Sequence, residues 1–155
     1  MIRTFDAATY FLLDGDGVRL QDFCGPFSDE YYIEGWIELN IGTIRLLGRE
    51  QCDLVDQLWA YLIDGTTQLL RGHSRWETYF PDQPLRLALQ LEGAKKLVFT
   101  VGEEQSTVKF SAFRNAVSLG GIQFFERMNE LLPKSSDVWS GYIEKSSSLV
   151  SENAR

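Results

Sequence analysis

The sequence predicts an α+β fold with two layers, in which a mostly antiparallel sheet of six or more strands carries two long helices on one face. Several runs alternate apolar and polar residues with the period of half-buried strands. Two longer runs show helical periodicity with a broad apolar side, which suits helices that lie on a sheet. Successive strands broken by only two helices are typical of α+β proteins.

The first predicted element is a hairpin near the N-terminus. Residues 10–13 and 18–20 are strand-like and flank the turn sequence Asp-Gly-Asp-Gly. With the apolar residues around it, this turn resembles the nucleophile motif of the haloacid-dehalogenase-like phosphatases. The resemblance implies that Asp14 attacks phosphorus, that Asp16 serves as the acid–base group and that magnesium joins them. That family continues into a helix, whereas this chain continues as a return strand, so we expect a turn without bound magnesium.

A second predicted hairpin spans residues 33–48, where apolar and polar positions alternate. We place its turn at residues 41–42. The alternative is a loop longer than two residues, because Ile41 disfavours the positive φ of such a turn. Opposite charges then face each other on one side and aliphatic residues on the other, as stable strand pairs require: Glu38 with Arg45, Glu34 with Arg49, Ile37 with Leu46, and Leu39 with Ile44. We expect Ile37 and Leu39 to be buried.

Trp36 falls on the polar side of this hairpin, between Glu34 and Glu38. A large aromatic side chain exposed among charges is typical of a binding hot spot. The alternative is that the C-terminal tail or the N-terminal hairpin covers the ring and forms a small second core.

A helix is predicted over residues 53–71. Asp53 is a suitable N-terminal cap, Asp56 falls in the first turn, and Gly72 ends the helix. Its polar stripe, which includes Asp64, is narrow, and nearly every other position is apolar.

Four strands then form a predicted meander over residues 75–80, 85–91, 96–101 and 107–113. The second long helix follows over residues 114–132 and ends at Pro133, although it could instead begin only after Gly121. Gly120 and Gly121 fall on its buried side, so a neighbour can approach closely there. We expect five aromatic residues to pack on the sheet: Tyr31, Tyr32, Trp76, Tyr79 and Phe80.

The chain is predicted to form a single domain over residues 1–133, since its length fits one domain and no linker divides it. The Ser-rich tail, residues 134–155, carries Trp139, Tyr142 and Ile143. We expect these three side chains to dock the tail on the domain or on a neighbour.

Composition narrows the possible functions. The chain has one histidine, His73, and two cysteines, Cys24 and Cys52, which are not spaced as metal ligands. We therefore expect no catalytic residues, no metal and no cofactor. The net charge of −7 argues against nucleic acid and against anionic membranes as ligands, and it permits a basic partner. Two unpaired cysteines are typical of a cytoplasmic protein.

The resulting hypothesis is a small acidic protein-binding module, of the inhibitor or immunity type, without enzymatic activity. The candidate contact residues lie on the open sheet face and along the first helix: Glu34, Trp36, Glu38, Asp53, Asp56 and Asp64. The alternative is an enzyme whose carboxylates converge only in three dimensions. The sequence leaves that alternative open, because its 22 acidic residues offer many pairs.

Overall fold

The computed structural model describes residues 5–150 and has the predicted α+β fold with antiparallel strands. Residues 1–4 and 151–155, the outer ends of the predicted domain and tail, lie outside the described residues. In chain order the elements are β1 (Phe5–Leu13), β2 (Asp16–Arg19), β3 (Glu34–Ile41), β4 (Ile44–Leu47), β5 (Asp53–Leu54), α1 (Val55–Leu70), β6 (Arg75–Tyr79), β7 (Arg86–Glu92), β8 (Lys96–Val101), β9 (Glu104–Lys109), α2 (Phe110–Leu131) and α3 (Ser136–Ser148).

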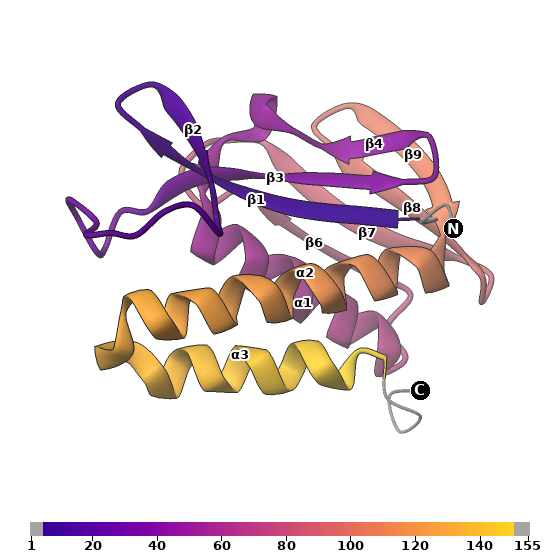
Figure 1. The fold of residues 1–155 in the computed structure, drawn as a ribbon. Coiled ribbons are helices and arrows are strands. Elements are labelled where there is room, and N and C mark those ends of the chain that lie inside the picture. Colours follow the sequence, from indigo (N-terminus) through magenta and orange to yellow (C-terminus); the bar gives the residue numbers. More distant parts are fainter. Residues whose placement is uncertain (1–4, 151–155) are drawn as a thin grey trace.

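The strands form two sheets where one was expected. Sheet A has the order β2-β1-β3-β4, and β5 pairs with the start of β3. Sheet B is the predicted meander, β6-β7-β8-β9. The edge strands β4 and β9 lie close together, yet no strand pairing joins them. The three helices gather on one side of the sheets (Figure 1).

The β3–β4 hairpin has the predicted strands but a different turn. Its turn is Gly42-Thr43, because Gly42 takes a positive φ of 60° and Ile41 stays in the strand opposite Ile44. A bulge then shifts the register and places Leu39 opposite Leu47. The predicted pairs were therefore wrong: Glu38 with Arg45, Glu34 with Arg49, Ile37 with Leu46, and Leu39 with Ile44. The predicted burial of Ile37 and Leu39 is confirmed.

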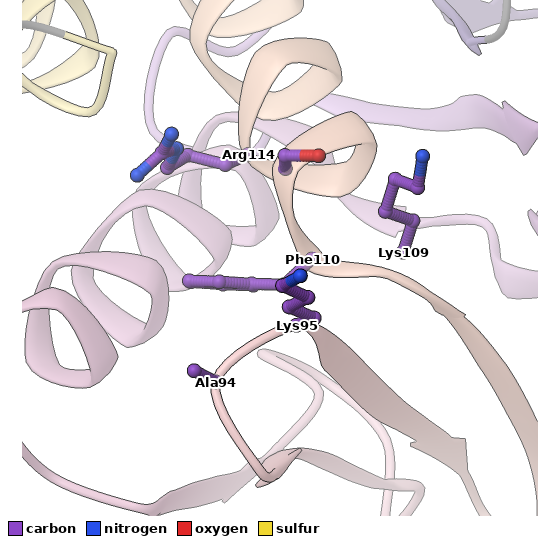
Figure 2. A pocket seen from close by; sticks show the side chains of 6 residues that line it. Ala94, Lys95, Lys109, Phe110 and Arg114 are labelled. Carbon is purple, nitrogen blue, oxygen red and sulfur yellow. The ribbon is translucent and has the colours of Figure 1, made fainter.

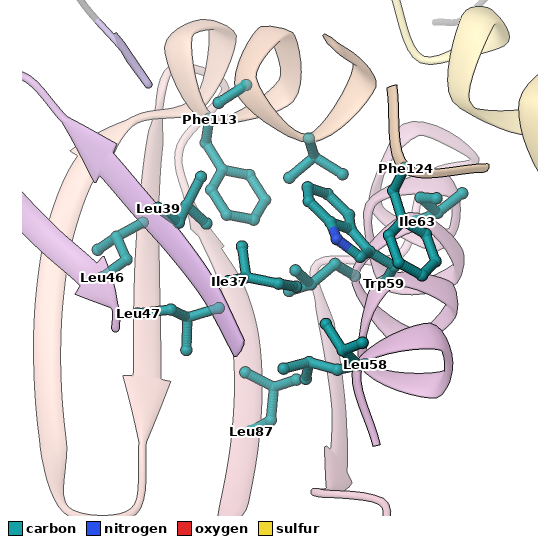
Figure 3. Packing of buried hydrophobic residues seen from close by; sticks show 14 of the residues in the cluster. Ile37, Leu39, Leu46, Leu47, Leu58, Trp59, Ile63, Leu87, Phe113 and Phe124 are labelled. Carbon is teal, nitrogen blue, oxygen red and sulfur yellow. The ribbon is translucent and has the colours of Figure 1, made fainter. Parts of the chain in front are cut away.

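One continuous apolar core joins both sheets and all three described helices. Ile37 of sheet A points toward Trp59 of α1, Leu39 lies beside Phe113 of α2, and Leu87 of sheet B lies near Leu58 of α1 (Figure 3). Trp59 is fully buried, and its indole Nε1 donates a hydrogen bond to Thr9 Oγ1 on β1 over 2.9 Å. The broad apolar sides of the helices therefore face the inner surfaces of both sheets.

Helix α2 begins earlier than predicted, at Phe110, and β9 ends at Lys109. The predicted strand over residues 107–113 was therefore wrong in its second half. Phe110, Phe113 and Val117 repeat with a helical spacing and are all buried on one side of α2. The apolar residues after Lys109 belong to this helical stripe and do not continue the strand. The helix runs through Gly121, which excludes the later start.

The segment after Pro133 forms helix α3, which lies along α2 (Figure 1). The Phe125 ring of α2 stacks on Trp139 and on Tyr142, at centroid distances of 5.8 and 5.0 Å. Ser118 Oγ donates to the carbonyl oxygen of Ser146 over 2.7 Å. Aromatic stacking and one buried hydrogen bond thus hold α3 on the domain.

Two of the helical glycines, Gly120 and Gly141, give opposite predictions for substitution by alanine. A Cβ on Gly120 would lie 2.8 Å from Ala7 Cβ and would also collide with Trp59, whereas a Cβ on Gly141 would meet nothing within 4 Å. Gly120→Ala should therefore destabilise the fold, because overpacking costs about 1–3 kcal/mol. Gly141→Ala should stabilise it by about 0.5–1 kcal/mol through helix propensity. Urea unfolding of both variants measures this, and a stabilising Gly120→Ala would contradict the described packing.

Candidate functional site

Trp36 is not an exposed hot spot, because neighbouring side chains cover it. Only 3% of the residue is exposed. Its ring stacks on Tyr10 of β1 at 5.2 Å, and the Arg49 guanidinium lies over it at 4.7 Å. Its Nε1 donates to Glu38 Oε2 over 3.3 Å. The N-terminal hairpin also contributes, since Gly17 lies directly under the ring. Trp36 thus belongs to a small second cluster on the outer face of sheet A.

The Asp-Gly-Asp-Gly sequence forms a hairpin turn. Asp14 and Gly15 have positive φ angles of 51° and 85° between β1 and β2, as a tight hairpin turn of mirror-image type requires. Asp14 and Asp16 are both exposed. Across residues 5–150, no group of three or more His, Cys, Asp or Glu side chains is arranged to hold a metal ion.

The prediction that Asp53 caps α1 was wrong, because Asp53 belongs to the short strand β5. The residue at the N-cap position is Leu54, which provides no capping side chain. The Asp53 carboxylate accepts hydrogen bonds from the Leu54 N–H and from Gln83 Nε2, each over 2.7 Å. Only 6% of Asp53 is exposed. The carboxylate instead links β5 to the turn between β6 and β7.

The other two acidic residues of α1 lie in separate surroundings. Asp64 accepts hydrogen bonds from Tyr142 Oη over 3.1 Å and from Lys145 Nζ over 3.4 Å, so α3 partly covers it. Asp56 is half-buried, and burial raises the pKa of its carboxyl. Of the six predicted contact residues, the structure brings together two pairs: Trp36 with Glu38, through a hydrogen bond, and Glu34 with Asp53, which line one pocket where β3 pairs with β5.

Glu34 and Asp53 line a pocket of about 230 Å³, which we call the acidic pocket. It is formed where the start of β3, the strand β5 and the turn before β7 meet. None of its lining residues is Lys or Arg: Tyr32, Glu34, Cys52, Asp53, Leu54, Asp82 and Gln83. Three acidic residues therefore line this pocket together with a tyrosine and a cysteine.

Negative charge dominates the electrostatics of this pocket. The Tyr32 hydroxyl donates a short hydrogen bond to Asp82 Oδ2. This bond and the charges of Asp82, Glu34 and Asp53 raise the pKa of Tyr32 to about 12. Burial, followed by the charges of Glu34 and Asp53, raises the pKa of the Cys52 thiol. Both groups are therefore held in their neutral forms near neutral pH.

Tyr32 lines the acidic pocket, and it is exposed together with Tyr31 and Tyr79, contrary to the expectation that these tyrosines pack on the sheet. Tyr31 is 94% exposed and Tyr32 is 45% exposed, both in the loop before β3. Tyr79, at the end of β6, is also exposed, whereas Phe80 is buried and Trp76 packs on Gly65 of α1. The pocket residues Tyr32 and Asp82 were not predicted as site residues, nor was the neighbouring Tyr31. The run Glu30-Tyr31-Tyr32 before Ile33 was the sequence feature that could have indicated an exposed binding loop.

Arg127 of α2 fixes the loop that carries these tyrosines. Its guanidinium donates to the carbonyl oxygens of Leu20 and Phe23, and it forms an ion pair with Glu130. Phe23 also packs edge-on against Phe11 of the core. The loop is thereby tied to the helical layer at its start and enters β3 at its end.

No protein-family model, curated protein or solved structure matches this chain. Among the described helices, none is both long and apolar enough to cross a membrane. The single histidine, His73, is exposed in the turn after α1 and does not line the acidic pocket.

The two free cysteines provide a test of the pocket's environment. Cys24 is exposed, whereas Cys52 is partly covered and has a raised pKa. Because the thiolate is the reactive form, iodoacetamide at about pH 8 should alkylate Cys24 roughly tenfold faster than Cys52. The difference between the two alkylation rates should become smaller as the pH rises and the Cys52 thiol ionises. Peptide mass spectrometry reads both sites in one sample, and equal rates at about pH 8 would contradict this environment.

Proposed function

We propose that this protein is a non-enzymatic binding module that recognises a basic protein partner through the acidic pocket and the tyrosines around it. The observation that carries the proposal is the convergence of Glu34, Asp53 and Asp82 in one pocket lined by no Lys or Arg. An inhibitor or immunity-type protein works in this way, by occupying a partner's surface. The proposal includes a cytoplasmic location, which the free thiols of Cys24 and Cys52 support.

The tyrosines supply the second part of such an interface. Tyrosine is enriched at binding hot spots because it buries a large area and still offers a hydroxyl group. Tyr31 is almost fully exposed, and it lies beside the pocket residue Tyr32 in the same anchored loop. An arginine or lysine of the partner would then meet the carboxylates while apolar groups pack on the rings.

Charge complementarity supports a basic partner. The net charge of −7 favours the approach of a cation over long range, and the exposed carboxylates of Glu34 and Asp82 act at short range. An interface of this kind associates rapidly and weakens as salt is added.

The arrangement of the pocket does not favour the alternative of an enzyme with a carboxylate-based site. Both oxygens of Asp53 accept hydrogen bonds within the protein, and Asp82 is engaged by Tyr32. The raised pKa of the Cys52 thiol lowers its thiolate fraction near neutral pH. A nucleophile needs an activating base, and His73 does not line the pocket.

Charge reversal tests the proposal. The double variant Glu34→Lys/Asp82→Lys reverses two exposed pocket charges. The control Glu126→Lys/Glu144→Lys makes the same change of net charge at exposed positions of α2 and α3. Immobilised wild type and control should capture the same basic protein from a lysate of the native host, whereas the pocket variant should lose most of it.

The proposal also predicts that added salt reduces capture by the wild type. Capture by the pocket variant at wild-type levels, or equal loss by both variants, would show that this pocket is not the interface. Circular dichroism of each variant checks that the fold is unchanged.

A further inference from the structure

The opposite end of sheet B has a second pocket of about 370 Å³, which we call the basic pocket. It lies between the β7–β8 turn and the first turn of α2, and its lining contains three cations, one hydroxyl and no carboxylate: Ala94, Lys95, Lys109, Phe110, Ser111 and Arg114. Figure 2 shows Lys109 and Arg114 pointing to opposite sides, with Phe110 and Lys95 between them. Such a concentration of positive charge stands out in a chain of net charge −7.

The strand pairing beside this pocket places like charges together. Lys109 of β9 lies directly opposite Lys96 of β8, and like charges in that position destabilise a sheet. Glu92 of β7 faces Lys96 from the other side and offsets part of the repulsion. No acidic residue lines the pocket next to Lys109.

The start of α2 adds positive potential to the same place. A helix N-terminus favours anions because its first N–H groups point outward unpaired. The first turn of α2 contains no acidic residue, and no side chain caps it. The Phe110 N–H donates a hydrogen bond to the Lys95 carbonyl oxygen. The N–H groups that follow have no side-chain acceptor from a cap. Lys109, a cation, occupies the N-cap position.

Arg114 provides a third unfavourable feature at this pocket, after the paired lysines and the uncapped start of α2. Its Nε is buried without a hydrogen-bond partner, the only such side-chain nitrogen or oxygen within residues 5–150. Its guanidinium carbon lies 5.9 Å from the centroid of the Phe110 ring. A buried donor without an acceptor is costly, and in natural proteins such a group calls for an explanation.

We propose that the basic pocket binds a small phosphate-bearing anion. Such a ligand would be neutralised by Lys95 and Lys109 and would accept hydrogen bonds from Ser111 and the first N–H groups of α2, while Arg114, which points to the other side, adds positive potential. The volume of the pocket lies in the range of small-molecule sites and is larger than a single ion the size of a water molecule would fill. The net negative charge of the protein opposes anions at long range, so the affinity comes from these local groups.

Calorimetric titration with inorganic pyrophosphate, and separately with inorganic phosphate, tests this site. Wild-type protein should bind pyrophosphate more tightly than phosphate. Lys95→Ala/Lys109→Ala should weaken pyrophosphate binding by about tenfold or more, because two charge-assisted hydrogen bonds are lost. The control Arg71→Ala/Lys134→Ala removes two exposed cations that do not line the pocket, and it should bind like the wild type.

Three results would overturn the proposal. These are no binding by the wild type up to about 10 mM pyrophosphate, undiminished binding by the pocket variant, or equal weakening in the control. The side chains of Lys95 and Lys109 have no hydrogen-bond partners in the described structure, and Lys109→Ala relieves the repulsion with Lys96. The pocket variant should therefore unfold at the wild-type temperature or above it. A thermal melt of each variant checks this.

Discussion

The burial of Trp59 is the constraint on which the rest of the structure depends. This one side chain joins three elements: its Nε1 bonds to Thr9 of β1, its ring faces Phe124 of α2 at 6.3 Å, and its backbone belongs to α1. Gly120 of α2 lets the ring approach the helix closely. This contact fixes α1, sheet A and α2 relative to one another, and α1 also packs on β6 and β7 of sheet B.

That shared core determines where the polar groups gather. In sheet B, the chain passes from the turn containing Asp82 to the turn containing Lys95 along β7. A strand of seven residues spans roughly 23 Å, so the two turns lie at opposite ends of the sheet. The start of β3 joins the first end, and the start of α2 joins the second. The protein therefore carries an acidic pocket at one end and a basic pocket at the other.

Local pattern was sufficient to predict most elements from the sequence. Alternation around Ile37 identified β3, and the broad apolar side around Leu58 identified α1. The turn chemistry after Leu13 identified the first hairpin. Prediction failed where the outcome depended on distant residues. The cover over Trp36 comes from Tyr10 and Arg49, and the proximity of Glu34 and Asp53 depends on a strand of only two residues.

The start of α2 shows a different reason for failure. Val108 and Phe110 alternate like strand residues, so the boundary between β9 and α2 was placed too late. That error hid the basic pocket, because Lys109 becomes an N-cap residue only when the helix starts at Phe110. With the correct boundary, Lys95 and Lys96 in the preceding turn and strand would have indicated a cluster of cations.

Separation of charge between the two ends is the central claim, and paramagnetic relaxation of amide protons measures it directly. A cationic nitroxide should broaden the amides of residues 31–34, 52–54 and 82–83 more than an anionic nitroxide does. The anionic probe should instead act on residues 94–96 and 109–114, and salt should reduce both contrasts. If both probes broadened the same amides to the same extent, the protein would have no such separation of charge.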